Sequence, residues 1–266
     1  MVTNEEIDNY ITKIPPLPES LKASISAINS GDLTKSALAA NEDPALKKFL
    51  IVLVNKPIYG FKDRVTDIRQ IFGILGVSGA KIVLYKYMIS LLSPSSWVLF
   101  SLSGKTFQDL QSYLSVEWQK ILKHKNIDDK EIESAITLLP ASILVCEALF
   151  KEHIDEVKLL KESSNIDYST ILKRLCGMDL FDICVKIATY WEMSESIKDV
   201  VLASSGAREI KDEKVKELGA LMHLLLFYKL SQSTCIEAGL NDFILFNVEF
   251  VQDVYEEFME IMEPAE

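Results

Sequence analysis

Apolar residues recur at spacings of three and four in almost every segment after Pro18. This spacing places them on one stripe of an α-helix that faces a core. Two stripes are typical: Phe107, Leu110, Leu114, Trp118, Ile121 and Leu122 form the first, and Leu180, Ile183, Cys184, Ile187, Ala188 and Trp191 form the second. The pattern predicts an all-α, multi-helical bundle.

Capping residues indicate where several helices begin. Asp32 follows a glycine, Asp43 precedes Pro44, and Ser78 stands before a long apolar run with helical spacing. A capping side chain accepts a backbone N–H of the first turn, and proline is tolerated at the first helical position. We therefore expect helix starts at these three residues.

The segment Asn55–Gly60 interrupts the helical pattern. Pro57 has no amide donor, and Gly60 suits a turn. The sequence predicts a compact elbow between two helices.

No Gly/Ser-rich linker, charge block or regular repeat divides the chain. The weakest points are the loops at Ser93–Ser96 and Ser204–Gly206. We expect one domain over residues 1–266, with two helical lobes that meet near the first loop.

The last predicted helix runs from Asn241 to Met262. It sets an apolar stripe against an acidic face; the stripe holds Val251, Val254, Tyr255, Phe258 and Met262, and the face holds Asp253, Glu256, Glu257 and Glu260. We expect a packed terminal helix with a solvated face, and a partner-binding helix is the alternative.

The formal net charge of -11 disfavours nucleic acids and anionic membranes as partners, because affinity for phosphate backbones depends on lysine and arginine.

The four cysteines are Cys146, Cys176, Cys184 and Cys235, and no two of them form a C-x-x-C pair. We expect each cysteine to be a small apolar residue of the core.

The sequence predicts neither a secretory signal nor a membrane span. The N-terminal residues lack the apolar run of a secretory signal. The longest apolar stretches, 138–150 and 219–230, are shorter than the ~18 residues of a membrane span. We expect a cytoplasmic protein.

Ser103-Gly104-Lys105-Thr106 resembles the end of a phosphate-binding loop, and the preceding Trp97–Phe100 could be a strand. A phosphate-binding loop needs a glycine at the position of Leu99, so a simple helix start is the better interpretation. The spacing of Gly73, Gly76 and Gly79 does not fit a dinucleotide fingerprint either, and tight helix packing or turns explain these residues.

The three histidines are scattered, whereas a metal hydrolase needs clustered ligands. His124 lies in a cationic run, and His153 has only Glu152 and Asp155 nearby as weak ligands. His223 lies in an apolar run, so a buried histidine with satisfied hydrogen bonds is expected there. No G-x-S-x-G elbow marks a serine nucleophile.

The first half of the chain carries an ordered set of residues, which comprises Ile14-Pro15-Pro16-Leu17-Pro18, Asp43-Pro44-Ala45-Leu46, Leu50, Val54-Asn55, Tyr59-Gly60, Ile68, Ile71 and Leu75-Gly76. Together these residues resemble the HD-related output domain (HDOD) family. Lys56 departs from the family, in which a small residue usually follows the asparagine. The family-like core spans about 14–205, and we expect the helices of 206–266 to pack on it.

The resemblance implies a fold related to HD-type metal phosphohydrolases and locates the positions of their metal ligands. The His-Asp doublet is replaced by Pro140-Ala141, the histidine of a Gly-x-Asp-His stretch by Leu180, and a His-His pair by Ser204-Ser205. Pro140 is expected to kink its helix without ending it. We expect no bound metal, cofactor or catalytic residue.

The resemblance then implies a non-catalytic regulatory or interaction module of bacterial signal transduction. It would bind a protein partner, such as a response regulator or motility component, or a small ligand, in a groove between the lobes. The candidate surface residues are Asn55, Pro57, Tyr59, Gly60, Ser204 and Ser205. The alternatives are a divergent phosphohydrolase that uses Asp179 or Asp182, and a nucleotide second-messenger sensor.

Overall fold

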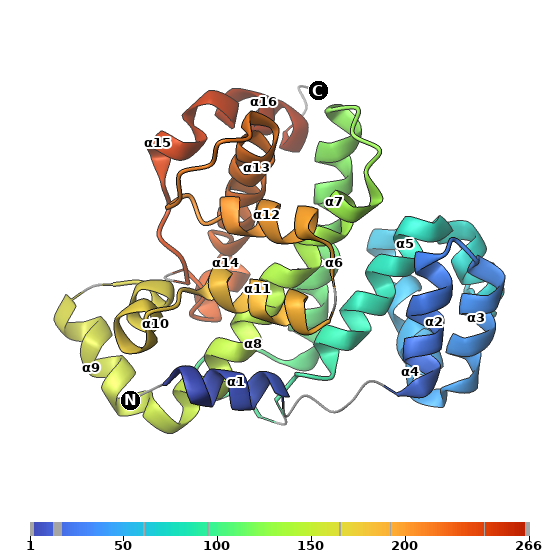
Figure 1. The fold of residues 1–266 in the computed structure, drawn as a ribbon, viewed down its shortest axis with the longest axis horizontal. Helices are drawn as coiled ribbons and strands as arrows, with labels where there is room; N and C mark the ends of the chain where they lie inside the picture. The colour runs from blue at the N-terminus through green and yellow to red at the C-terminus, as the bar shows by residue number, and fades with distance from the viewer. Residues whose placement is uncertain are drawn as a thin grey trace. The chain divides into compact units, whose positions relative to one another are not determined.

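The computed structural model describes residues 3–12, 18–60, 62–94, 96–164, 166–191, 193–241 and 243–263. The described residues form helices and connecting loops without a β-strand, so the predicted all-α fold is confirmed. The chain divides into two compact units: a smaller unit of residues 15–91 and a larger unit of residues 1–14 and 92–266. The division falls beside the loop at Ser93–Ser96. Figure 1 shows the order of the helices along the chain.

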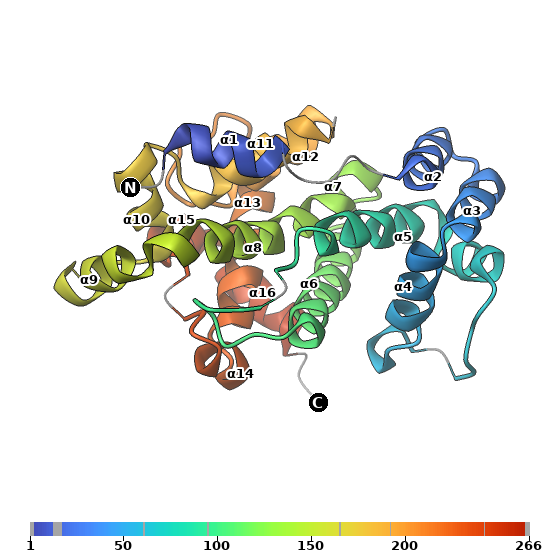
Figure 2. The same cartoon turned by 90° about the horizontal axis from the view of Figure 1, so that it is seen from below.

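The smaller unit is a bundle of α2 (Glu19–Asn29), α3 (Leu33–Glu42), α4 (Pro44–Val54), the 3-10 turn η1 (Pro57–Tyr59) and α5 (Ile68–Ser90). The predicted caps are confirmed at the starts of α3 and α4: Asp32 accepts the N–H of Lys35, and Asp43 accepts those of Ala45 and Leu46. Figure 2 shows these helices from a second direction. The family-like marks Ile14–Leu17 lie outside the described residues.

The predicted helix start at Ser78 lies within two residues of the point where a second helical segment begins after a kink. α5 begins at Ile68, after the cap Asp67, and it is kinked at Gly76, whose φ of 66° and ψ of -176° are not helical. Ser78 follows this kink inside the helix. Only glycine adopts this backbone conformation readily, so the glycine rather than the serine interrupts the helix.

The larger unit contains the remaining helices. They are α1 (Asn4–Thr12), α6 (Gly104–His124), α7 (Lys130–Ala135), η2 (Ile136–Leu138), α8 (Leu139–Phe150), η3 (Lys151–His153), α9 (Ile154–Ser164), α10 (Tyr168–Cys176), α11 (Leu180–Tyr190), α12 (Glu195–Ala203), α13 (Glu213–Leu230), α14 (Ser233–Glu237), α15 (Val248–Val251), η4 (Gln252–Val254) and α16 (Tyr255–Met262).

Helix α8 lies at the centre of the larger unit, and every residue except Ala148 is buried. Pro140 occupies its first turn, directly after the 3-10 turn η2, and the chain stays helical through both. The expectation that Pro140 does not end the helix is confirmed, because proline is tolerated in the first turn of α8, where its missing N–H has no intrahelical partner.

Two helical stretches are long and apolar enough to cross a membrane by length and composition, Ile68–Ser90 and Glu131–Ser163. The second is longer than the sequence suggested, because helical geometry continues through the 3-10 turns. Their apolar windows are 61% and 89% buried inside the protein, as in core helices of a soluble protein.

Trp97–Phe100 is not a strand. The backbone N–H groups of Val98, Leu99 and Phe100 instead donate to the carboxylate of Glu147, which is fully buried in α8. Three backbone donors satisfy this buried carboxylate without a cation. After this segment, Ser103 and Thr106 form a capping box, which confirms that the Ser103–Thr106 motif is a helix start.

The predicted terminal helix begins too early at Asn241. Its start is Val248, because the side chain of Asn247 accepts the N–H of Phe250. Val251, Val254 and Phe258 are buried as expected, whereas Tyr255 is 48% exposed.

Candidate interaction site at the Ser204–Gly206 loop

A pocket of about 150 Å³ opens beside the Ser204–Gly206 loop, wholly within the larger unit. Its walls come from the first turns of α10 and α11, the loop after α12, and the segment before α15. The lining residues are Asp167, Ser169, Thr170, Lys173, Asp179, Phe181, Ser205, Gly206, Ala207, Ile244, Leu245 and Asn247. The lining therefore combines hydroxyl groups, two carboxylates, an amide and one ammonium group with apolar side chains.

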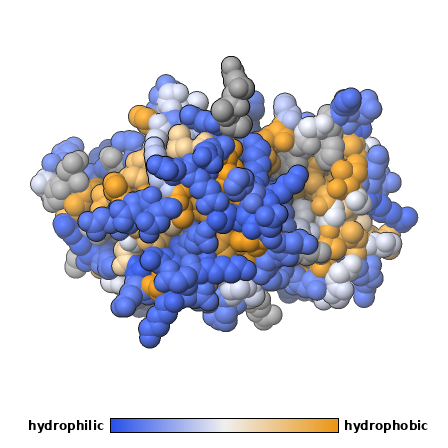
Figure 3. Space-filling view, turned by 90° about the horizontal axis from the view of Figure 1, so that it is seen from above, coloured by the Kyte–Doolittle hydropathy of each residue, from blue (hydrophilic) through white to orange (hydrophobic). Residues whose placement is uncertain are grey.

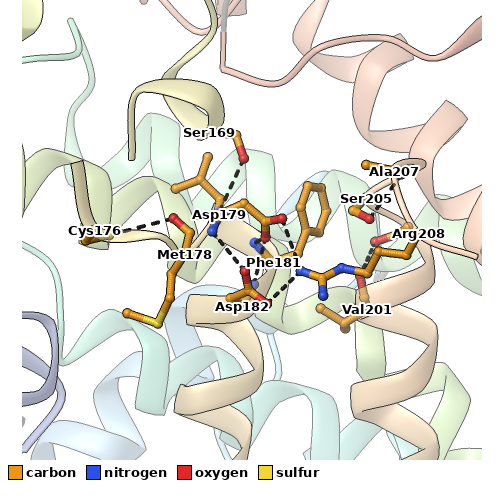
Figure 4. Close-up of polar contacts among 12 residues, drawn as sticks. Ser169, Cys176, Met178, Asp179, Phe181, Asp182, Val201, Ser205, Ala207 and Arg208 are labelled. Atoms are coloured by element: carbon orange, nitrogen blue, oxygen red, sulfur yellow. Dashed lines mark hydrogen bonds and ion pairs between the residues drawn. The ribbon is translucent and has the colours of Figure 1, made fainter. Parts of the chain in front are cut away.

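Asp179 fixes the start of α11 in one wall of the pocket (Figure 4). Its Oδ1 accepts the N–H groups of Phe181 at 3.0 Å and Asp182 at 2.9 Å. In return, Oδ2 of Asp182 accepts the N–H of Asp179 at 2.9 Å. Gly177, with φ of 77°, ends the preceding helix α10. The Gly177–Leu180 stretch is thus a tight turn between two helices.

Arg208 occupies the remaining carboxylate oxygens. Its Nη2 donates to Oδ2 of Asp179 at 3.1 Å and to Oδ1 of Asp182 at 2.6 Å. All four oxygens of the two carboxylates therefore have a donor. A cation placed between them would have to displace the guanidinium group and overcome its repulsion at short range. This geometry does not fit the metal ligands that the phosphohydrolase alternative requires of Asp179 and Asp182.

The other inherited ligand positions do not fit a metal either. The aliphatic side chains at Pro140, Ala141 and Leu180 are buried in the core. Ser204 is also buried, and its hydroxyl donates to the carbonyl of Val201 at 2.7 Å. In the described part of the chain, no group of three or more histidine, cysteine or acidic residues could hold a metal ion.

His223 joins the two loops that border the pocket. Its Nδ1 lies 2.9 Å from the carbonyl of Ser204, and its Nε2 accepts the N–H of Asn247 at 3.2 Å. This pairing requires the neutral ring with the proton on Nδ1. Burial lowers the pKa of His223, and the hydrogen bond to Ser204 opposes that effect more weakly. The expected buried and satisfied histidine is confirmed.

Asn247 and Gly206 complete this connection. The amide nitrogen of Asn247 donates to the carbonyl of Gly206 at 2.6 Å. Gly206 has φ of 66°, and a Cβ built there would lie 3.1 Å from Phe250 and 3.3 Å from Asn247. Ser205 lines the pocket, and its hydroxyl accepts the N–H of Ala207 at 3.3 Å. We call His223, Asn247, Ser204 and Gly206 the loop clamp.

The elbow at Asn55–Gly60 belongs to the smaller unit. The side chain of Asn55 donates to the carbonyls of Ile51 and Val65, each at 2.7 Å, and accepts the N–H of Val65 at 2.8 Å. Pro57 begins the turn η1, and Gly60 ends it with φ of 70°. The elbow is confirmed, and Asn55 holds it closed. The side chain of Tyr59 lies outside the described part of the chain.

The remaining histidines lie on the surface. His124 is 3.6 Å from Glu257, and His153 lies 3.9 Å from Glu6 and 3.6 Å from Glu156. Sequence spacing predicts Glu152 and Asp155 as the acidic neighbours of His153. The contact with Glu6 was not predictable from local spacing, because α1 carries it from the other end of the chain.

Comparison with known proteins supports the fold. The family model of the HDOD domain matches residues 14–206. An HDOD domain protein of unknown function from Geobacter sulfurreducens is 14% identical, with a TM-score of 0.66 over 97% of this chain and 96% of that chain. No curated protein sequence matches this chain.

Two further solved structures share the fold at low identity. A candidate phosphohydrolase from Shewanella amazonensis SB2B is 15% identical, with a TM-score of 0.62 over 96% of both chains. A candidate signal transduction protein from Marinobacter aquaeolei VT8 is 18% identical, with a TM-score of 0.57 over 97% of this chain and 64% of that chain.

Proposed function

Because the chain belongs to the HDOD domain family, we propose that it is a non-catalytic regulatory module of cytoplasmic bacterial signal transduction, which acts by binding a protein partner. The family and its signal-transduction relative support a signalling role. Absence of catalysis, the protein partner and the location in the bacterial cytoplasm are the parts we propose.

The observation that carries the proposal is the pairing of Arg208 with Asp179 and Asp182. A phosphohydrolase would need these carboxylates open to a metal that activates water. Here the arginine and the backbone of α11 use all four oxygens, beside Leu180, where the family resemblance implies a histidine ligand in catalytic relatives.

The pocket beside Ser205 favours a protein partner over a nucleotide. Its volume of about 150 Å³ is below the roughly 300 Å³ at which pockets for drug-sized ligands begin. It can accept one side chain against Phe181 and Ile244, with Lys173 and the hydroxyl groups at its rim. Leu245 is 73% exposed beside it, which offers further apolar surface for a partner.

Metal content and hydrolysis test the first part of this proposal. Full-length protein, purified without chelators, should contain far less than one equivalent of iron, manganese, zinc or nickel. It should release no phosphate from p-nitrophenyl phosphate when these metals are added. A stoichiometric metal together with phosphate release would overturn the proposal and favour the phosphohydrolase.

A pocket-filling variant tests the second part. Ser205→Trp should abolish capture of the partner from a lysate of the native cell, whereas Ser101→Trp, at an exposed serine elsewhere in the larger unit, should not. Equal capture by both variants would show that the pocket is not the binding site. Thermal stabilisation of the wild type by cyclic dinucleotides would instead favour the second-messenger sensor.

A further inference from the structure

The two units carry opposite net charges. Residues 15–91 contain ten Lys and Arg against six Asp and Glu, which gives +4. The rest of the chain then contains 18 Lys and Arg against 33 Asp and Glu, which gives -15. A single chain therefore presents a basic and an acidic surface, and either could bind the other between two copies.

The basic charge of the smaller unit gathers at its elbow. Lys48 and Val52 lie four residues apart on the exposed face of α4, so they are neighbours on the helix surface. The exposed Pro57 and Ile58 follow in the turn η1. Val52 is 52% exposed and Ile58 is 37% exposed.

The loop after the elbow adds two more cations and one exposed carboxylate, Asp63. The hydrogen bonds between Asn55 and Val65 return this loop to the end of α4, which brings the exposed Lys62 and Arg64 to the same end of the bundle. We define the elbow surface as Lys48, Val52, Pro57, Ile58, Lys62 and Arg64. Among the described residues, none of its three cations forms an ion pair. Figure 3 shows hydrophobic side chains gathered on one face of the α2–α5 bundle.

The complementary surface lies on the last helical segment. Glu249, Asp253, Glu256 and Glu260 recur at spacings of four, three and four, and all are exposed. Glu249 lies in α15, Asp253 in the 3-10 turn η4, and Glu256 and Glu260 on one face of α16, whereas Val251, Val254 and Phe258 of the same segment are buried. We define the acidic stripe by these four carboxylates, which form no ion pair with any described residue.

Apolar side chains accompany the acidic stripe. Val248 and Tyr255 lie seven residues apart, on one flank of the stripe, and they are 64% and 48% exposed. Glu257, in contrast, is directed toward Lys125 and His124. The stripe thus combines unpaired carboxylates with apolar surface, as the elbow surface combines unpaired cations with apolar surface.

We propose that the elbow surface of one copy of this protein binds the acidic stripe of a second copy. Three cations then meet four carboxylates, while Val52 and Ile58 pack against Val248 and Tyr255. Isolated surface ion pairs contribute little, so the association depends on the group of charges and on the apolar contacts together. The two surfaces differ, so the contact is heterologous and repeats from copy to copy, as an open chain or a closed ring.

Nucleic acid and anionic membrane fit the elbow surface less well. Affinity for a phosphate backbone grows with the number of phosphates neutralised, and the elbow offers three unpaired cations on a chain of net charge -11. The acidic stripe has the opposite sign, is apolar on one flank, and is present at the same concentration as the elbow.

Sedimentation velocity of the full chain tests this proposal. At about 0.15 M salt the mean mass should rise with protein concentration, and at about 1 M salt, where the Debye length falls to about 3 Å, it should return to that of the monomer. Lys62→Glu with Arg64→Glu should abolish the rise, and so should Glu256→Lys with Glu260→Lys. The variant that carries all four substitutions should associate again, because the reversed charges still match.

A mixture and a control make the result specific. Each double variant should be monomeric alone, but the two should associate when mixed, because the unchanged elbow of one meets the unchanged stripe of the other and the two reversed surfaces also match. The control is Lys158→Glu with Lys214→Glu, at two exposed lysines of the larger unit that form no ion pair with a described residue. It changes the net charge as much as Lys62→Glu with Arg64→Glu does, and it should associate as the wild type does. Circular dichroism should show the same helix content in every variant.

Several outcomes would overturn the proposal. They are a monomer at all concentrations, an elbow reversal without effect, a four-fold variant that stays monomeric, and binding of duplex DNA or phosphatidylserine vesicles that the elbow reversal removes. None of these outcomes bears on the proposed function, because the pocket at Ser205 lies in the larger unit and is tested by Ser205→Trp.

Discussion

The elbow of the smaller unit and the Ser204–Gly206 loop of the larger unit both turn through a glycine in the left-handed region, with φ of 70° at Gly60 and 66° at Gly206. Polar side chains hold both loops: the amide of Asn55 bonds both sides of the elbow, whereas the ring of His223 bridges Ser204 and Asn247, and the side chain of Asn247 binds Gly206. The surroundings differ. No atom lies within 4 Å of a Cβ placed on Gly60, whereas three side chains crowd one placed on Gly206.

The comparison separates two ways of fixing a loop. The elbow is held locally, by a group that does not titrate, and its outer side is open to a partner. The loop clamp is held by an imidazole inside the core, together with residues from two other segments of the larger unit. Changes at the clamp should therefore cost more stability than equivalent changes at the elbow.

The largest effect is expected from His223→Phe. Phenylalanine keeps the aromatic packing against Phe246 and Phe250 but leaves the carbonyl of Ser204 and the N–H of Asn247 without their partner. Unsatisfied buried groups cost about 1–3 kcal/mol each, so we expect a loss of ~3 kcal/mol in the free energy of unfolding. Urea denaturation measures it, and His124→Phe at the surface should change it by less than ~0.5 kcal/mol.

Asn55→Ala should have the next largest effect. It removes three hydrogen bonds that are partly buried, and we expect a loss of ~2 kcal/mol. The rate of backbone amide hydrogen exchange should rise across residues 56–67 and stay unchanged around Ser204. Asn55→Asp keeps the acceptor for Val65 but places a carboxylate oxygen against the carbonyls of Ile51 and Val65, so it should cost at least as much as alanine. Faster exchange at Ser204 in either variant would contradict the local role of Asn55.

Local chemistry explains which features were predictable. Helix periodicity and the caps at Asp32 and Asp43 depend on residues within one turn, and the structure confirms them. Ser78 looked equally like a cap, but a sequence does not show which of several nearby glycines adopts positive φ, and Gly76 does so. Asn241 and Asn247 are similar candidates for the start of the last helix, and tertiary packing selects the second.

The site depends on contacts that sequence spacing does not record. Arg208 pairs with residues 26 and 29 positions away, and no motif connects them. The apolar run around His223 indicated a buried ring, but Asn247, which is 24 residues distant, could not be identified as its partner. Of the pair that the family resemblance singled out, Ser205 lines a pocket, and its role in binding a partner stays a prediction.

Alanine at the two glycines separates backbone strain from crowding. Both positions have positive φ, which costs a non-glycine residue ~1 kcal/mol. Gly60→Ala should cost only this amount, because its Cβ meets no neighbour. Gly206→Ala should cost ~2 kcal/mol, because Phe250, Asn247 and His223 must also shift. Thermal unfolding of the two variants measures the difference, and equal losses would show that the clamp can relax around the added methyl group.

The smallest effect is a pH dependence confined to the clamp. Burial lowers the pKa of His223 in the folded protein below its ordinary value of 6.5, so as pH falls below 6.5 the unfolded chain binds a proton before the folded protein does. The contribution of His223 is thus fully present above pH 6.5 and is lost as pH falls toward its folded pKa. The difference in unfolding free energy between wild type and His223→Phe should therefore shrink as pH falls from about 7.5 to about 5. Taking this difference cancels the titration of the carboxylates, which both proteins share.

The corresponding difference for Asn55→Ala should stay constant over the same range, because an amide does not titrate. A constant difference for His223→Phe would mean that the ring accepts a proton in the folded protein as readily as in the unfolded chain, and that the N–H of Asn247 does not depend on a neutral imidazole.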